Sequence, residues 1–325
     1  MDLDVVFLGT AGAVPTALRG PAGYLVRRGG ERLLVDCGEG TQRQLLRSVA
    51  GLPDIDAALV THLHADHVLG LPGMLKTFAL RGREVPLAIH GPAGLTALFS
   101  SLGRVIGRLP YQLDLIELAP GQTLERDGYR IEPFATDHRV PSLGYALCEH
   151  VRPGRFDVET ATSLGVPFGP LCGALQRGET VTLDDGRVVT PAEVMGRPRP
   201  ARRVVFSGDT RPCAATLEAS AGADLLVHEA TFLDDEQQRA RETGHSTARE
   251  AAELARDAQV SLLALTHLST RYTGGRVRDE ARTVFESVVV PRDLDLVELP
   301  FAARGSPRLV RGDGRQPPVA VPTPG

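Results

Sequence analysis

Three histidines and one aspartate fall within six consecutive positions, in the run HLHADH at residues 62–67. Neutral imidazoles are the commonest zinc ligands in proteins, and carboxylate oxygens bind zinc as well. On a tight loop, His62 and His64 can point to one side while Asp66 and His67 point to the other, which suits two adjacent metal ions better than one. The alternative is a polar loop whose histidines are satisfied by hydrogen bonds, an interpretation that a lone histidine would favour.

Three further candidate ligands each follow an apolar, strand-like run: His138 after 129–134, Asp209 after 204–205 and His267 after 261–264. Strand ends of one sheet present side chains to a shared rim, so we expect these residues to lie together. The predicted ligand sets are His62, His64, His138 and Asp209 for one ion, and Asp66, His67, Asp209 and His267 for the other. Asp209 would bridge both ions, and the open positions left for water predict a catalytic site rather than a closed structural one.

Short strand-like runs broken by glycine-rich turns must position these ligands, together with a smaller number of helices. The predicted strands are 5–8, 24–26, 32–35, 55–60, 204–206, 224–227 and 261–265, and the predicted helices are 41–49, 74–80, 93–102 and 247–258. Strands this short and apolar are typical of sheets covered on both faces. The pattern predicts an α/β (α+β) fold with two central sheets and helices outside them, a four-layer αββα sandwich.

The segment of about 150–200 breaks this rhythm because it is dense in glycine and proline, which disfavour packing in a core. Residues 181–189 nevertheless predict a β-hairpin around Asp185-Gly186. We therefore expect an ordered excursion, a protruding arm, inserted into a single domain of residues 1–305. The proline-rich tail of residues 306–325 is expected to fray.

The composition of the 325 residues, 42% hydrophobic and 23% charged, excludes a disordered or fibrous protein. No apolar run approaches the ~20 residues that cross a bilayer, and the acidic start runs straight into a strand without a signal peptide. Four widely spaced cysteines are typical of a reduced, cytoplasmic protein. The net charge of −4 argues against general coating of nucleic acid, although a local basic surface remains open.

The spacing of the HLHADH run and the separate histidine, aspartate and histidine segments resembles the metallo-β-lactamase superfamily and, within it, the ribonuclease Z family of tRNA 3′-processing endonucleases. The resemblance covers nearly the whole chain. It is carried by FLGTAGAVP (7–15), DCGEGTQ (36–42), HLHADHVLGLPG (62–73), SGDT (207–210), HEAT (228–231), GHST (244–247) and HLSTRY (267–272). In the excursion, PGRF (153–156) and LGVPFGPL (164–171) look like the tRNA-binding arm of that family.

The resemblance implies a metallo-β-lactamase fold, two Zn²⁺ ions per subunit, a homodimer and a precursor tRNA as substrate. The implied reaction hydrolyses the phosphodiester on the 3′ side of the discriminator nucleotide and leaves a tRNA 3′-hydroxyl. Asp66 would accept a proton from the attacking water as well as bind metal. His245 would protonate the departing 3′-oxygen, oriented and kept charged by Glu229. From local sequence alone, His245 could equally be a residue that precedes a helix cap and has no chemical role.

Six residues are candidates for binding the tRNA: Arg155, Phe156, Gly169, Pro170 and Arg177 in the arm, and Arg271 beyond the last ligand. The segment 150–203 carries eight arginines against six acids, which supports an RNA-binding arm only weakly. Arg271 could contact a phosphate or be an ordinary exposed arginine. Ala17 and Gly20 stand where relatives often carry Lys and Asn in a Pro-x-Lys-x-Arg-Asn loop, which leaves the cut position relative to CCA open.

Two other functions share these motifs. One is a hydrolase of small phosphodiesters, sulfates or esters with the same fold, which would have no use for the arm. The other is a non-catalytic RNA-binding protein, which would have no use for an open metal site. Neither accounts for the ligand positions, the arm and the His245–Glu229 pair together.

Overall fold

The computed structural model describes residues 2–52 and 54–312. Contacts between residues divide the chain into two compact units. The main unit holds the described residues up to Cys148 and from Arg202 onward, and the arm unit is Glu149–Ala201. The segment that breaks the rhythm of the sequence thus folds as a unit of its own.

The first sheet of the main unit has eight strands in the order β17-β16-β1-β2-β3-β4-β5-β6. Strands β3 to β6 run parallel, whereas the pairings from β3 back to β17 are antiparallel. The strands are β1 (Leu3–Gly9), β2 (Gly23–Arg28), β3 (Glu31–Cys37), β4 (Ala57–Leu59), β5 (Leu87–Gly91), β6 (Leu113–Glu117), β16 (Leu296–Glu298) and β17 (Arg308–Val310).

The second sheet has seven strands in the order β15-β14-β13-β12-β9-β8-β7, and β12 to β15 run parallel. Its strands are β7 (Leu124–Arg126), β8 (Tyr129–Ala135), β9 (Leu143–Glu149), β12 (Arg203–Phe206), β13 (Leu225–Glu229), β14 (Leu262–Thr266) and β15 (Val288–Val289). Parallel strands end at one edge of their sheet, so segments that follow β12, β13 and β14 meet there.

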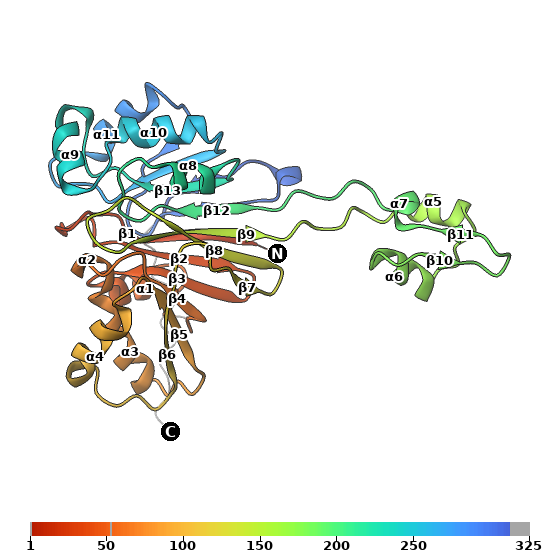
Figure 1. Cartoon of the computed structure of the whole chain (residues 1–325), viewed down its shortest axis with the longest axis horizontal. Coiled ribbons are helices and arrows are strands. Elements are labelled where there is room, and N and C mark those ends of the chain that lie inside the picture. Colours follow the sequence, from red (N-terminus) through yellow and green to blue (C-terminus); the bar gives the residue numbers. More distant parts are fainter. Residues whose placement is uncertain (1, 53, 313–325) are drawn as a thin grey trace. The chain divides into compact units, whose positions relative to one another are not determined.

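The two sheets pack face to face over a core that includes Phe7, Tyr24, Tyr145 and Phe206. Helices cover both outer faces, so the strands are buried on each side and their sequences are apolar throughout. Figure 1 shows these helical layers above and below the sheets. The first sheet is covered by α1 (Thr41–Arg47), α2 (Ala65–Val68), α3 (Gly70–Leu80) and α4 (Leu95–Ile106), and the second by α8 (Ala214–Ser220), α10 (Ala248–Asp257) and α11 (Gly274–Arg282). The predicted four-layer αββα sandwich is confirmed.

The remaining short elements of the main unit are α9 (Gln237–Thr243) and the 3₁₀ turns η1 (Asp234–Glu236) and η2 (Ala302–Arg304). Helix α10 shows how the sequence fixes an outer helix: Thr247 caps its first turn in a capping box with Glu250, and the alanines on one face are buried. Among the described residues, no helix is long and apolar enough to span a bilayer.

The predicted fraying from residue 306 is wrong for Arg308–Val310. These residues form β17, an edge strand that pairs antiparallel with β16, and Leu309 packs against the core between the sheets. Arg308 also bonds to Glu298 at 2.8 Å. Apolar side chains and strand pairing therefore outweigh the proline-rich composition that follows. The rest of the predicted tail, residues 313–325, lies outside the described residues.

The arm unit contains α5 (Val158–Ser163), α6 (Pro170–Gln176), α7 (Pro191–Val194) and a hairpin of β10 (Val181–Thr182) with β11 (Val188–Val189). The hairpin forms where it was predicted, with Gly186 in the left-handed region at φ 83°. Contrary to the expectation from its glycine and proline content, the unit has its own apolar cluster, made of Ala161, Val166, Leu175, Val181, Leu183, Val189 and Val194. Turn formers shape the chain while the residues between them pack.

Candidate metal centre and active site

All seven predicted ligand side chains lie together where strands of both sheets end. The segment after β4 carries the 62–67 run, the segment after β12 carries Asp209 and the segment after β14 carries His267. Gly208 makes the close approach of two of these segments possible, since it has a φ of 60° and a Cβ there would lie 2.8 Å from that of Thr61. The seven residues are His62, His64, Asp66, His67, His138, Asp209 and His267.

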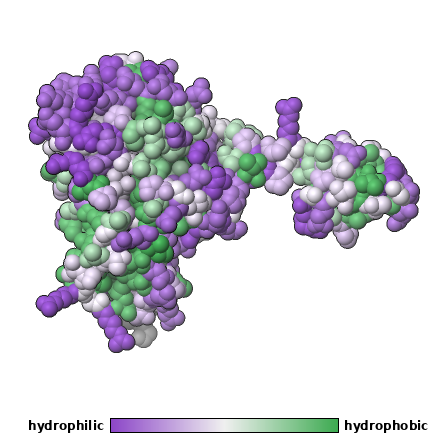
Figure 2. Space-filling view, viewed as in Figure 1, coloured by the Kyte–Doolittle hydropathy of each residue, from purple (hydrophilic) through white to green (hydrophobic). Residues whose placement is uncertain are grey.

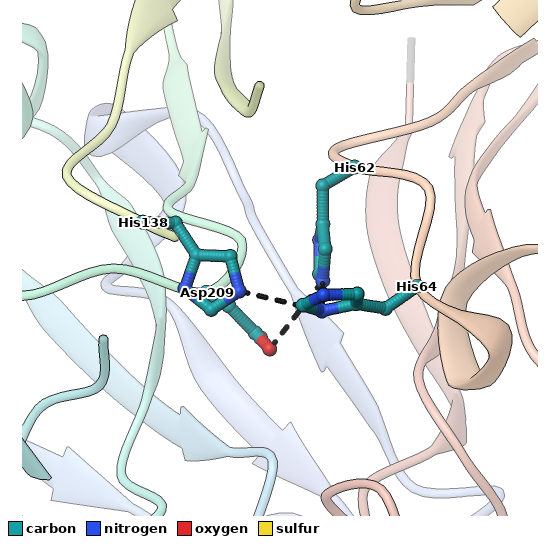
Figure 3. A group of neighbouring side chains, drawn as sticks. All are labelled: His62, His64, His138 and Asp209. Carbon is teal, nitrogen blue, oxygen red and sulfur yellow. Dashed lines mark hydrogen bonds and ion pairs between the residues drawn. The ribbon is translucent and has the colours of Figure 1, made fainter. Parts of the chain in front are cut away.

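The first group consists of His62, His64, His138 and Asp209, each of which offers one ligand atom within 4.8 Å of the others. His64 Nδ1 lies 2.9 Å from His62 Nε2 and 3.4 Å from His138 Nε2. Asp209 Oδ2 lies 3.6 Å from His62 Nε2. Figure 3 shows His62 and His64 approaching from one side and His138 and Asp209 from the other. This is the first set predicted from the sequence.

The second group consists of Asp66, His67 and His267. Asp66 Oδ2 lies 3.3 Å from His267 Nε2 and 3.5 Å from His67 Nε2. Asp209 joins this group too, because its Oδ1 is 3.5 Å from His67 Nε2 and its Oδ2 is 3.3 Å from His267 Nε2. The carboxylate of Asp209 thus stands between both groups, as a bridging ligand would.

The outer ring nitrogens are fixed by hydrogen bonds that aim the inner nitrogens into the cluster. His67 Nδ1 donates to Asp36 at 2.8 Å, His267 Nδ1 to Thr231 at 2.8 Å and His138 Nδ1 to the Gly244 carbonyl at 2.7 Å. Metal-binding histidines are usually held in this way. The Nε2 of buried His67 faces the cluster with no hydrogen-bond partner. An orphaned imidazole nitrogen among carboxylates and other imidazoles fits a metal ion.

Asp36 is a site residue without a predicted role, although its segment DCGEGTQ is one of those that resemble the family. It is the penultimate residue of β3 and accepts hydrogen bonds from both the backbone and the hydroxyl of Thr61 at 2.8 Å, besides that of His67. Its φ of 55° is a left-handed conformation that an aspartate tolerates better than most residues. The available signal was an acidic residue directly after the buried apolar run of residues 33–35.

We expect Asp36→Ala to weaken metal binding by roughly 10–100-fold, the usual effect of losing a carboxylate that orients a ligating histidine. Titration against a chromophoric chelator measures this directly. Asp56→Ala, which removes an exposed aspartate that bonds the Arg32 amide, is the control and should leave metal affinity unchanged. An unaltered metal affinity in Asp36→Ala would show that His67 does not need this hydrogen bond to bind the metal.

His245 and Glu229 lie beside the cluster as a hydrogen-bonded pair. His245 Nδ1 donates to Glu229 Oε1 at 2.8 Å, and the buried carboxylate also accepts from the Thr210 amide and the Thr231 hydroxyl. Burial alone would lower the pKa of His245, but the carboxylates of Glu229 and Asp209 outweigh it and raise the pKa to about 9. Helix α10 is capped by the side chain of Thr247. A role in starting this helix therefore does not explain why a histidine stands at position 245.

Charged neighbours keep the carboxylates of the site ionised. Burial raises the pKa of Asp66, but its hydrogen bond with His267 and the charge of His67 outweigh burial and bring the pKa below its usual range. The pKa of Glu229 is likewise lowered, against the effect of burial, by His245. Ionised carboxylates can bind cations and accept protons.

Of the predicted tRNA-binding residues, only Arg271 belongs to the main unit. It is exposed after the His267 segment, 3.8 Å from Glu236, with its guanidinium 6.0 Å from the Phe232 ring. The others belong to the arm unit: Arg155 is exposed, Phe156 packs against the apolar cluster, Gly169 and Pro170 begin α6, and Arg177 pairs with Glu179 at 2.8 Å.

Two family models match the chain: one described as the metallo-beta-lactamase superfamily over residues 18–144, and one described as a beta-lactamase superfamily domain over residues 194–268. Ribonuclease Z of Methanosarcina acetivorans is 48% identical over 92% of this chain and 99% of its own. Ribonuclease Z of Haloferax volcanii is 49% identical over 93% of this chain and 96% of its own.

Among solved structures, the short form of human tRNase Z superimposes with a TM-score of 0.66 at 27% identity, covering 91% of this chain and 99% of that one. The similarity to the two ribonuclease Z relatives therefore extends over more than nine tenths of this chain. The chain belongs to the ribonuclease Z family of the metallo-β-lactamase superfamily, whose members are metal-dependent endoribonucleases that process tRNA 3′ ends.

Proposed function

We propose that this chain is a zinc-dependent endoribonuclease that removes 3′ trailers from precursor tRNA. It hydrolyses the phosphodiester on the 3′ side of the discriminator nucleotide and leaves a tRNA 3′-hydroxyl. The observation that carries the proposal is the seven-residue cluster with the His245–Glu229 pair beside it, in a chain 48% identical to a ribonuclease Z. A cluster without the pair would fit a small-molecule hydrolase as well.

Imidazole nitrogens with carboxylate oxygens suit zinc. The first ion would be held by His62, His64, His138 and Asp209, and the second by Asp66, His67, Asp209 and His267, giving two Zn²⁺ per subunit. Bound there, the ions would polarise water and neutralise charge that develops on the phosphate.

Two side chains of the protein would accept and donate the protons that move in the reaction. Asp66 has a side chain 12% exposed, so its carboxylate can reach a water and accept its proton. His245, 15% exposed and held by Glu229, can donate its proton to the departing 3′-oxygen. An alkoxide is a poor leaving group, and such general acid catalysis contributes about 10²–10⁴-fold in rate.

Incubation of zinc-loaded protein with a precursor tRNA that carries a 3′ trailer tests the proposal. The expected product ends in a 3′-hydroxyl at the discriminator nucleotide, as sequencing of its end would show. Turnover of small phosphodiesters alone, or binding without cleavage, would overturn it. A product that keeps CCA would correct the cut position, which the substitutions Ala17 and Gly20 leave open.

The arm unit is proposed to bind the tRNA. It folds around its own apolar cluster, so it does not need an RNA partner to form a core. Phe168, at 95% exposure, and Arg155 are both exposed, and an aromatic ring can stack on an unpaired base while a guanidinium can bind phosphate.

Replacing Glu149–Ala201 with a short turn should raise KM for precursor tRNA by at least about tenfold, because the binding surface is lost while the metal site remains. The replacement is feasible since Arg203 pairs directly with Cys148 across β12 and β9. Steady-state kinetics on precursor tRNA, with a chromogenic phosphodiester as control, measure the effect. Equal losses on both substrates would assign the arm unit a role in folding instead.

A homodimer is proposed from apolar surface on the main unit. Its exposed large apolar side chains fall in the first 116 residues and include Leu69, Leu80, Val85 and Val105 around α3 and α4. Figure 2 shows apolar surface over this part of the main unit. Patches of this kind favour protein–protein contact, here a second copy. Light scattering of the Leu80→Glu variant, which measures the mass of the particle in solution, tests the proposed dimer.

With four free cysteines, the protein is proposed to act in the cytoplasm.

A further inference from the structure

Five arginines surround one cavity of the main unit, away from the metal-site residues. The cavity has a volume of about 390 Å³, and no acidic side chain is among the residues that line it. Its arginines are Arg19, Arg278, Arg282, Arg292 and Arg311, and its other walls are the start of α11 at Thr273–Gly275, the run Val288–Val290 and Leu309. We call it the arginine cavity. Arginine rims and helix N-termini both favour phosphate.

Part of this charge has no internal counterion. Arg278 pairs with Asp279 at 2.7 Å, and Arg311 pairs with the buried Asp295. The guanidinium groups of Arg282 and Arg292, in contrast, make no hydrogen bond or ion pair with any residue in 2–52 or 54–312. Two unneutralised arginines at one concave surface are available for an anionic ligand.

Arg19 is fixed at the inner wall of the arginine cavity. Its Nη1 donates to the Thr10 hydroxyl at 2.5 Å and to the Pro291 carbonyl at 2.7 Å. A Cβ on Gly274 would come within 3.0 Å of Arg19 Nη2, so this glycine allows the guanidinium to pack on the first turn of α11. Burial lowers the pKa of Arg19, and the charge of Arg292 adds to this effect although Asp293 opposes it. A bound anion would relieve that repulsion.

Backbone contacts connect the arginine cavity to the metal site. The Leu268 amide donates to the Thr10 carbonyl, and the Gly12 amide donates to the Leu268 carbonyl, both at 3.0 Å. Gly12 also lies against the His267 ring, which a Cβ would meet at 3.4 Å. One segment of the chain therefore contacts His267 at one end and supplies Arg19 at the other.

We propose that the arginine cavity binds the single-stranded 3′ trailer of the precursor, with phosphates on the arginines and a base on the apolar floor. The proposal rests on the function proposed above. Val288 and Val290 are buried at that floor, and an unpaired base can enter a hollow that bases stacked in a duplex stem cannot. Because the chain carries a net charge of −4, a local concentration of arginine favours RNA at this surface over the rest of the main unit.

Trailer length is the measurement that tests this. Precursors with trailers of one and of about ten nucleotides are compared on the wild type and on Arg282→Glu/Arg292→Glu. The wild type should show a KM roughly tenfold lower for the long trailer, and the variant should lose that advantage. The salt dependence of binding should fall by about 1.4 in log–log slope, at 0.7 per lost phosphate contact. An advantage that persists in the variant, or is absent from the wild type, would overturn the proposal.

Controls separate this proposal from the function on which it rests. The one-nucleotide precursor and a chromogenic phosphodiester should be cleaved equally by wild type and variant, whereas a wild type that cleaves no precursor would refute the nuclease itself. Arg282→Gln/Arg292→Gln, which removes charge without reversing it, should show a smaller loss of the same kind. Arg256→Glu, an exposed reversal on α10, should change nothing. If adenosine monophosphate competes as strongly as a ten-nucleotide RNA, the ligand is a mononucleotide and not the trailer.

Discussion

Asp66→Ala is expected to reduce cleavage of precursor tRNA by at least about 10³-fold while the affinity for tRNA is kept. The substitution removes a ligand atom 3.3 Å from His267 Nε2 and 3.5 Å from His67 Nε2 and, with it, the proposed acceptor of the water proton. The proposed RNA-binding surfaces are untouched. Single-turnover kinetics and a gel-shift assay on the same preparation measure the two effects separately.

Asp137→Ala is a matched control for this prediction. Asp137 is an exposed aspartate next to His138 that pairs with Arg211 at 3.0 Å and belongs to neither ligand group. Its loss should leave cleavage within about threefold of the wild type, as surface ion pairs contribute little. If Asp66→Ala retains activity, or loses tRNA binding in parallel, its assignment to the chemical step is wrong.

His245→Ala should lower the rate of precursor cleavage by about 10²–10⁴-fold, the contribution of a positioned general acid. A chromogenic phosphodiester with a nitrophenolate leaving group should be affected far less, because that group leaves without a proton. The ratio of the two losses therefore reports the protonation role itself. A merely structural His245 would lower both rates equally.

Glu229→Gln should reproduce part of this effect. The amide can still accept the 2.8 Å hydrogen bond from His245 but carries no charge, so the pKa of His245 should fall from its raised value. The loss on precursor tRNA should exceed the loss on the chromogenic substrate, as for His245→Ala but to a smaller degree. Equal losses of rate on the two substrates would show that Glu229 only holds the segment of His245 in place.

The four layers and the positions of the seven clustered residues could be predicted because both follow from local pattern. Apolar runs identify buried strands, and histidine or aspartate directly after such a run must lie at the edge of a sheet. His138, Asp209 and His267 are distant in sequence, yet this rule was enough to group them with His62. The topology of the sheets then brings His138 and Asp209 into the group of His62, and His267 into the adjoining group of Asp66 and His67.

Other features depend on contacts that no local pattern encodes. Asp36 holds His67 across 31 positions, and Thr231 holds His267 across 36. Their roles follow only from the pairing of β3 with β4, which the 62–67 run follows, and of β13 with β14. The arginine cavity is another such case, because Arg19 and Arg292 line one cavity although 273 positions of the sequence separate them. The glycine- and proline-rich composition predicted fraying at β17 and little packing in the arm unit. In both places a few apolar residues are enough to fix the structure.

The order in which the chain supplies its cluster has a consequence during translation. His62 to His67 come from the half of the chain made first, whereas Asp209 and His267 come from the half made last. A nascent polypeptide still short of His267 therefore lacks one member of the second group and the residue against which Gly12 lies. We therefore expect hydrolysis of RNA only from chains already extended past His267, although folding of the early strands begins sooner.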